Sequence, residues 1–323
     1  MIFPSNLKDG DLVGVTACSC GVLKKIEKYE RSIKNFKDYS KFNLIETNNV
    51  RTDGVVSSDR YTRKMELESL YKNDDVKAIT IASGGDFLSD MLNVIDYDVI
   101  RNNVKWICGS SDPTSLLYTI TTNLDIATIY SPCNMSGFKV SPLHESYVNY
   151  FRILKGDLVK QCKFDKCEDG GFSDELNTDN VWMNINGDVD ASGILIGGCI
   201  DSLKDIIGTK FDKTKEFIDK YKENGIIWYF DVFSMTSEGL YNTLVQFRNA
   251  GWFENCKAIL IGKVCIPGSF VDMSYEELIG NAIPDIKVVY KFDIGHVKPS
   301  FTMINGAKVR VVSDKDEGYL EYL

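Results

Sequence analysis

The fold is decided by residues 76–112, VKAITIASGGDFLSDMLNVIDYDVIRNNVKWICGSSD. Residues 76–82 form a nearly continuous apolar run, which is expected of a strand buried on both faces. Gly84 and Gly85 follow at once, and residues 87–95 then show apolar side chains at helical spacing. Residues 105–108 form a second short strand. This alternation of strands and helices predicts a parallel sheet with helices on both faces.

The alternation continues on both sides of this stretch. Toward the amino terminus it predicts strands at 12–16 and 42–46 and helices at 23–36 and 59–72. Toward the carboxyl terminus it predicts a helix at 237–250 and strands at 193–199, 226–230, 258–262, 288–290 and 308–312. We therefore expect an α/β protein.

The length of 323 residues favours two domains over one. Residues 156–190 are polar, acidic and glycine-bearing, with little periodicity, and they are predicted to be a linker. Residues 1–155 would then form an amino-terminal α/β domain and residues 191–323 a carboxy-terminal domain.

Composition excludes several classes of partner. The net charge is −9 and the basic residues are scattered, so a polyanion such as nucleic acid would be repelled.

The first residues do not resemble a signal peptide, and no apolar stretch approaches the roughly 20 residues that span a bilayer, so we expect a cytoplasmic protein without membrane contact. Nine dispersed cysteines and two histidines give no metal-site spacing. The cysteines are therefore expected to be reduced, with no bound metal.

The turn Gly109-Ser110-Ser111-Asp112 is the first candidate for chemistry. It joins a strand to a predicted helix with Pro113 at its start, a position where proline is well tolerated. Several hydrolases present a nucleophilic serine on such a turn, where backbone N–H groups face the developing oxyanion. A serine or aspartate that only caps the helix is the alternative interpretation. Gly84 and Gly85 similarly fit either an N–H donor at a strand end or an ordinary tight turn.

An acid and a base complete the candidates. Asp231 ends the apolar run 226–230, and it is either a catalytic carboxylate or a capping residue. Glu238 is a weaker alternative because it lies inside a predicted helix. His296 lies in a loop between strands, where a scaffold can position catalytic groups. His144 begins a helical stretch and is expected to be structural. Serine needs a base to accept its proton, and a carboxylate fixes the imidazole tautomer of that base.

In order and at plausible spacing, these segments resemble those of the LD-carboxypeptidase family, which includes murein tetrapeptide carboxypeptidases and microcin C immunity peptidases. The resemblance covers nearly the whole chain. It is carried by an LKxGD-like opening, a glycine turn, a GxSD nucleophile turn, a GGNLxxLxxLxGT-like segment and a GHxxP histidine motif, at residues 7–11, 83–86, 109–112, 197–209 and 295–299.

The resemblance implies a serine carboxypeptidase that hydrolyses an amide next to a free carboxylate without a metal or organic cofactor. Ser111 would be the nucleophile and His296 the general base, with the N–H groups of Gly85 and Asp112 as the oxyanion hole. The substrate would be a small peptide: a murein tetrapeptide in peptidoglycan recycling, or a microcin C-like peptide-nucleotide. The implied fold is a class I glutamine amidotransferase-like (flavodoxin-like) parallel-sheet domain plus a smaller carboxy-terminal α/β domain, in a homodimer.

The chain departs from the family pattern in two places. A gap-free count from Gly251 places Asp231 where the family usually has the triad Glu, and Asp is one methylene shorter. Ser83 and Asp86 replace the usual Arg and Tyr, and Asp86 could repel a substrate carboxylate or select for an amine. A relative that binds peptides without cleaving them is therefore the alternative function.

Overall fold

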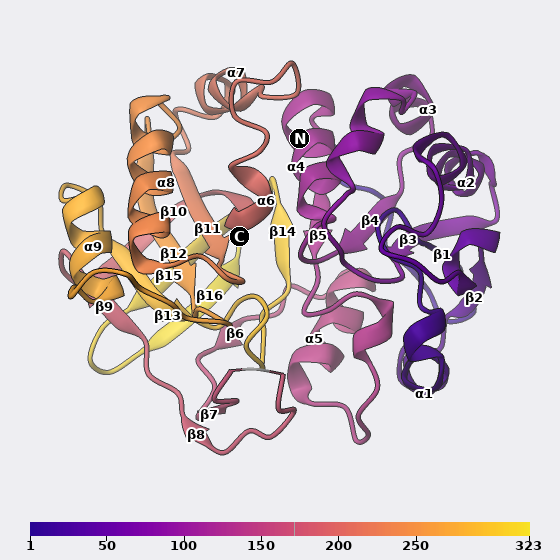
Figure 1. Ribbon diagram of the computed structural model, residues 1–323, viewed down its shortest axis with the longest axis horizontal. Coiled ribbons are helices and arrows are strands. Elements are labelled where there is room, and N and C mark those ends of the chain that lie inside the picture. Colours follow the sequence, from indigo (N-terminus) through magenta and orange to yellow (C-terminus); the bar gives the residue numbers. More distant parts are fainter. Residues whose placement is uncertain (171) are drawn as a thin grey trace. The chain divides into compact units, whose positions relative to one another are not determined.

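A computed structural model describes residues 1–170 and 172–323 as an α/β protein of two compact units (Figure 1). The amino-terminal unit comprises Met1–Asp157 with Thr302–Ile304, and the carboxy-terminal unit comprises Leu158–Phe301 with Asn305–Leu323. The chain therefore returns once to the first unit near its end.

The sheet of the amino-terminal unit has the strand order β14-β5-β4-β3-β1-β2. The strands β1 to β5 pair in parallel, and their order is a common one for doubly wound sheets. Ligands of such sheets usually bind at the carboxyl ends of the strands. The strands are β1 (Leu12–Thr16), β2 (Asn43–Glu46), β3 (Val76–Ile81), β4 (Trp106–Gly109), β5 (Thr128–Tyr130) and β14 (Met303–Asn305).

The helices of this unit begin at capping residues that the sequence supplies. The Asp59 carboxylate accepts hydrogen bonds from the first turn of α2, and the His144 ring accepts one from the N–H of Ser146 in α5. His144 is thus a capping residue, as its position predicts. The helices are α1 (Ile26–Ser40), α2 (Arg60–Lys72), α3 (Tyr97–Asn102), α4 (Thr114–Leu124) and α5 (Glu145–Leu154).

The helix predicted over residues 87–95 is wrong apart from the short 3-10 helix Ser89–Asn93. Two polar contacts hold the start of this stretch outside a regular helix. The N–H of Leu88 donates to the Asp112 carboxylate, and the carbonyl of Phe87 accepts from the Arg63 guanidinium. These contacts come from distant parts of the chain, so local periodicity could not reveal them.

The carboxy-terminal unit is built on a mixed sheet with the order β6-β16-β15-β10-β11-β12-β13-β9. The strands β10 to β13 pair in parallel, and antiparallel strands flank them on both sides. The central strands are β10 (Val189–Cys199), β11 (Ile226–Asp231), β12 (Cys256–Gly262) and β13 (Val288–Phe292). The strands β15 (Lys308–Ser313) and β16 (Gly318–Tyr322) follow near the end of the chain.

Helices α8 (Ser237–Asn249) and α9 (Tyr275–Ala282) pack side by side against this sheet (Figure 1), and α6 (Ile200–Leu203) and α7 (Thr214–Lys220) complete the unit. The core beside α8 is aromatic. The Trp228 ring stacks on Trp252 at 5.5 Å between centroids, and Trp252 stacks on Phe247 at 4.3 Å. Burial of such large rings dominates core energetics, so this cluster fixes α8 beside β11.

In its described residues, the predicted linker at 156–190 contains the start of β10 and four short strands: β6 (Gln161–Cys162), β7 (Lys166–Cys167), β8 (Thr178–Asp179) and β9 (Met183–Ile185). Strands β6 and β9 are the two edges of the eight-stranded sheet. Strands of two or three residues are too short to show an alternation of polar and apolar side chains, which explains why they could not be predicted. Residue 171, which falls within this prediction, lies outside the described residues.

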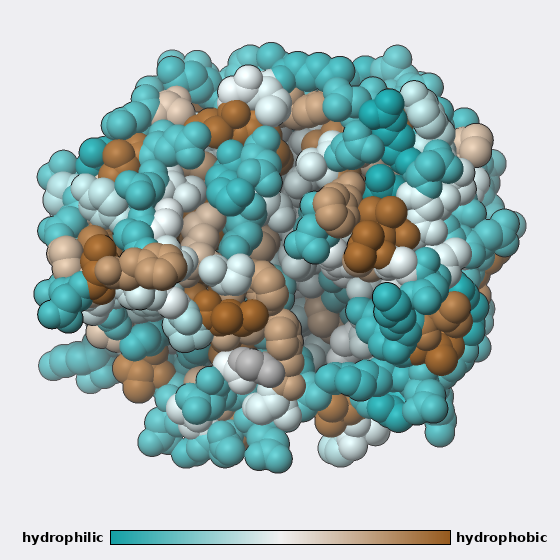
Figure 2. Space-filling view, viewed as in Figure 1, coloured by the Kyte–Doolittle hydropathy of each residue, from teal (hydrophilic) through white to brown (hydrophobic). Residues whose placement is uncertain are grey.

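The surface in Figure 2 is mainly hydrophilic, with apolar side chains in separate small groups. In the described part of the chain, no helix has the length and apolarity that crossing a membrane requires. All nine cysteines are free thiols.

Candidate active site

Ser111 lies in the turn between β4 and α4, in a backbone conformation that L-residues rarely adopt. Its φ is +67°, and the side chain is half-buried. The turn leads directly into the helix, because the N–H of Thr114 donates to the carbonyl of Ser111 at 2.8 Å. A strained strand-to-helix turn of this kind exposes a nucleophilic serine in several hydrolase folds. A residue that only caps a helix does not need this positive φ.

Two side chains from farther along the chain hold this turn. The N–H of Ser111 donates to the Tyr130 hydroxyl at 2.9 Å. The amide of Asn134 accepts from the N–H of Ser110 at 3.0 Å and donates to its carbonyl at 2.9 Å. Asn134 thus holds the backbone just before Ser111 through both the oxygen and the nitrogen of its side-chain amide. Sequence analysis missed Tyr130 and Asn134, and their spacing carries no signal that could have found them.

The glycine turn after β3 lies against Ser111. A Cβ added to Gly84 would lie 3.1 Å from the Cβ and 3.3 Å from the Oγ of Ser111, so a side chain there would crowd the serine. In the described part of the chain, the backbone N–H groups of Gly85 and Asp112 donate no hydrogen bond. Both N–H groups are therefore available to an oxygen of a substrate.

The side chain of Asp112 joins three segments around Ser111. One carboxylate oxygen accepts hydrogen bonds from the Ser19 hydroxyl, after β1, and from the N–H of Leu88, at 3.0 Å for the latter. Burial raises the pKa of this carboxyl, and the two hydrogen bonds oppose that rise. Asp112 therefore fixes the glycine turn and the serine turn to the end of β1.

In the carboxy-terminal unit, the structure brings Asp231 and His296 together. Asp231 is the last residue of β11 and is fully buried. Its Oδ2 lies 2.7 Å from Nδ1 of His296, and its Oδ1 accepts the backbone N–H of His296 at 3.1 Å. Because the carboxylate occupies Nδ1, Nε2 is the ring nitrogen that can accept a proton.

The loop after β13 can approach Asp231 this closely because residue 295 is glycine. Gly295 has φ +96°, and a Cβ there would overlap the Asp231 carboxylate. The loop is also tied on both sides: the N–H of Gly295 donates to the Ser300 hydroxyl at 2.9 Å, and Asp293 is buried and paired with Lys263 at 2.7 Å. The histidine is therefore positioned by backbone contacts as well as by its ring.

The pKa of His296 is raised above its ordinary value. Burial of the ring is the largest single influence and lowers the pKa, but the charge and hydrogen bond of Asp231, aided by Asp201, outweigh it. Asp201 lies in α6 and accepts hydrogen bonds from the N–H groups of Phe233 and Ser234, at 2.9 and 3.2 Å, so it also holds the segment after β11. Sequence analysis did not single out Asp201.

Cys199, Asp231 and His296 have potential ligand atoms within 4.8 Å of one another, so these three residues could be considered as metal ligands. Two ligands of one tetrahedral zinc ion, each about 2.0 Å from it, lie about 3.3 Å apart. The Asp231 and His296 atoms are 2.7 Å apart, which is a hydrogen-bond distance. The two groups are thus in direct contact, with too little separation for both to bind one zinc ion. Burial also raises the pKa of the Cys199 thiol, which disfavours the thiolate form.

The alternative acid, Glu238, is engaged elsewhere. Its carboxylate accepts from the Ser237 hydroxyl at 3.1 Å and from the N–H of Phe270 at 3.5 Å, at the start of α8. Asp231 is the acid that contacts His296. Ser111, Gly85 and Asp112 belong to the amino-terminal unit, and Asp231 and His296 belong to the carboxy-terminal unit.

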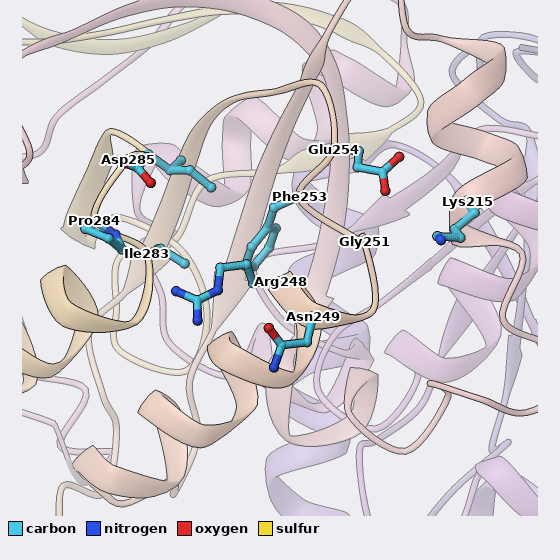
Figure 3. A pocket seen from close by; sticks show the side chains of 10 residues that line it. Lys215, Arg248, Asn249, Gly251, Phe253, Glu254, Ile283, Pro284 and Asp285 are labelled. Carbon is cyan, nitrogen blue, oxygen red and sulfur yellow. The ribbon is translucent and has the colours of Figure 1, made fainter.

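A separate pocket of about 370 Å³ lies in the carboxy-terminal unit near the end of α8 (Figure 3). Two cations, Lys215 and Arg248, and two carboxylates, Glu254 and Asp285, line it together with apolar side chains. Arg248 is partly engaged, since its guanidinium donates to the carbonyl of Ala282. No residue proposed for catalysis lines this pocket, and its charges balance.

Two family models match the chain in succession. The LD-carboxypeptidase N-terminal domain matches residues 13–131, and the LD-carboxypeptidase C-terminal domain matches residues 192–311. The chain belongs to the LD-carboxypeptidase family. The resemblance that the sequence motifs carry is thereby confirmed.

Individual relatives of this LD-carboxypeptidase family member are distant. The microcin C7 self-immunity protein MccF of Escherichia coli is 27% identical over 286 residues, which cover 82% of this chain and 79% of MccF. A structure of MccF has a TM-score of 0.87 at 21% identity and covers 100% of this chain and 98% of its own. A muramoyltetrapeptide carboxypeptidase from Oxalobacter formigenes has a TM-score of 0.75 at 18% identity, with 96% and 98% covered. These structures share the two-domain α/β fold.

The short side chain of Asp231 reaches His296 because the loop after β13 passes close to the end of β11. The backbone N–H of His296 donates directly to the Asp231 carboxylate, so the loop backbone at His296 lies against the end of β11.

Proposed function

We propose that the protein is a serine carboxypeptidase that hydrolyses an amide bond next to a free carboxylate, with Ser111, His296 and Asp231 as its triad. The observation that carries the proposal is the pairing of His296 Nδ1 with a fully buried Asp231, at 2.7 Å. An isolated surface histidine would need no such partner. A carboxylate in this position fixes the tautomer of a general base and stabilises its charged form.

The proposed mechanism uses groups of the chain itself. Nε2 of His296 takes the proton of Ser111 as Oγ attacks the scissile carbonyl, and the N–H groups of Gly85 and Asp112 stabilise the oxyanion. The same imidazole then donates the proton to the leaving nitrogen, which leaves an acyl-enzyme. Water, activated by Nε2, hydrolyses the acyl-enzyme and restores Ser111.

The amino-terminal unit would be of the glutamine amidotransferase kind, with the nucleophile at the carboxyl end of β4. The strand order and the positive φ of Ser111 support this assignment. The acid and the histidine would come from the carboxy-terminal domain.

The proposed substrate class is a small peptide conjugate, either a murein tetrapeptide or a microcin C-like peptide-nucleotide. MccF has been solved with aspartyl sulfamoyl adenosine and with glutamyl sulfamoyl guanosine, at 20% identity to this chain in both cases. The muramoyltetrapeptide carboxypeptidase relative favours the murein peptide. Both classes present an amide close to an acidic group.

A turnover screen tests the proposal. Purified protein is incubated with muropeptides and with aminoacyl sulfamoyl nucleotides, and products are resolved by mass spectrometry. Ser111→Ala should lower kcat/KM by about 10³-fold or more, because the nucleophile is lost while binding remains. Hydrolysis by Ser111→Ala at the wild-type rate would rule out the triad.

A further inference from the structure

Lys25 lies beside the glycine turn that contacts the nucleophile. It directly precedes α1 and is half-buried. Its Nζ donates to the Ser83 hydroxyl at 2.6 Å, and Ser83 immediately precedes Gly84 and Gly85. An ammonium group is thus held one residue from the backbone that packs on Ser111.

This ammonium has no anionic partner within the described residues, 1–170 and 172–323. Its neighbour in the chain, Lys24, is exposed and pairs with Asp53 at 3.4 Å. Lys28 and Lys139 add further positive charge near Lys25, and burial is the main cause that lowers the Lys25 pKa. A half-buried cation with only a hydroxyl partner is costly unless an anion binds it.

We propose that Lys25, oriented by Ser83, binds the free carboxylate next to the scissile amide. This inference rests on the proposed function and names its specificity determinant. The Arg that the family usually has at residue 83 is absent, and Lys25 supplies a cation to the same turn from another segment. Asp86, which could have repelled the carboxylate, is exposed and forms no ion pair in the described chain.

The dimensions fit a substrate with a terminal carboxylate. That group lies one residue, roughly 3.8 Å, from the carbonyl that is attacked. A cation that binds this carboxylate must therefore lie beside the glycine turn, and Ser83 holds Lys25 there. The other buried cation near this turn, Arg63, is occupied by the carbonyls of Cys18 and Phe87, at 2.8 and 3.0 Å. Lys25, which pairs with no carboxylate in the described residues, remains open to a substrate.

Matched substrates and variants test the inference. The substrates are the murein tetrapeptide ending in D-alanine and the same peptide with a carboxy-terminal amide. The variants are Lys25→Met, Lys25→Arg and the control Lys24→Met, which removes the same charge from the exposed neighbour. Binding of each peptide is also measured by calorimetry in the Ser111→Ala background, so that affinity is read without turnover.

We expect Lys25→Met to lower both kcat/KM and affinity for the acid peptide by about 10- to 100-fold, as loss of a charge-assisted hydrogen bond does. For the peptide with the carboxy-terminal amide, both values should change by less than about 3-fold. Lys25→Arg should restore most of the preference for the acid, and Lys24→Met should retain it. Retained activity of Lys25→Met on the amide shows that this variant still folds.

An unchanged preference for the acid in Lys25→Met would overturn the inference, as would equal losses for acid and amide, since these indicate only a support role for the turn. Absence of binding by either peptide would also overturn it. Failure of the proposed function gives a different result: no turnover by the wild type, with binding and its dependence on Lys25 intact.

Discussion

Asp231 contacts His296 through both carboxylate oxygens, and this double contact is the central feature at the scale of single residues. One oxygen faces Nδ1 of the ring and the other accepts the backbone N–H. The acid thus raises the pKa of the imidazole and fixes its position, and in the proposed mechanism it also sets the tautomer. Replacement of Asp231 should therefore change all three.

Asp231→Asn should shift the pH profile in a defined direction. A raised pKa means that His296 keeps its proton to a higher pH, so the acidic limb of kcat/KM in the wild type should lie above that of an ordinary imidazole. The substitution removes the main influence that raises the pKa and leaves burial, which lowers it. The acidic limb should move to lower pH while kcat falls by about 10³- to 10⁴-fold.

Glu238→Gln is the matched control for this measurement, because it also neutralises a carboxylate of the same unit but one without contact to His296. Its pH profile should match that of the wild type. An acidic limb of Asp231→Asn at the wild-type pH would contradict the role given to Asp231.

At the scale of elements, the predicted catalytic groups follow the carboxyl ends of parallel strands. Ser111 follows β4, Asp231 ends β11, and His296 lies in the loop after β13. Strand ends fix the backbone and leave the next residues free to turn, so side chains there can be held accurately. Gly295 provides the turn that carries His296 to Asp231.

Gly295→Ala should therefore destabilise the protein and remove most of its activity. Alanine at a positive φ costs about 1–2 kcal/mol, and at Gly295 its Cβ would also overlap the Asp231 carboxylate and displace the loop. Gly187→Ala is the control, because Gly187 has φ +104° with no atom within 4 Å of an added Cβ. The melting temperature and kcat/KM of both variants are compared.

We expect the larger loss of melting temperature for Gly295→Ala, and loss of activity in that variant alone. Equal melting temperatures together with full activity in both variants would show that the approach of the loop to Asp231 is not required.

Much of this arrangement could be predicted from the sequence because it follows from local patterns. The apolar runs of β3 and β11 marked buried strands, and the rarity of histidine left little choice of base. Contacts made across the chain were not predictable in the same way. Asn134 holds Ser110 from 24 residues away, and Ser83 receives Lys25 from 58 residues away. Such pairs depend on which strands become neighbours, and periodicity does not encode that order.

At the scale of the whole molecule, the proposed function requires groups from both units to act on one substrate. The amino-terminal unit supplies Ser111 and the oxyanion donors, and the carboxy-terminal unit supplies Asp231 and His296. Neither unit alone would have activity, since serine without a base is a poor nucleophile. A relative that only binds peptides would need no such division of groups.

Labelling with a fluorophosphonate, located by mass spectrometry, tests this central claim most directly, because the reagent reacts with a serine that a base has activated. The account predicts a stable adduct on Ser111 in the wild type and no adduct in His296→Ala. Circular dichroism of His296→Ala should show that this variant is folded. An unmodified Ser111 in the wild type, or equal labelling of Ser111 without His296, would contradict it.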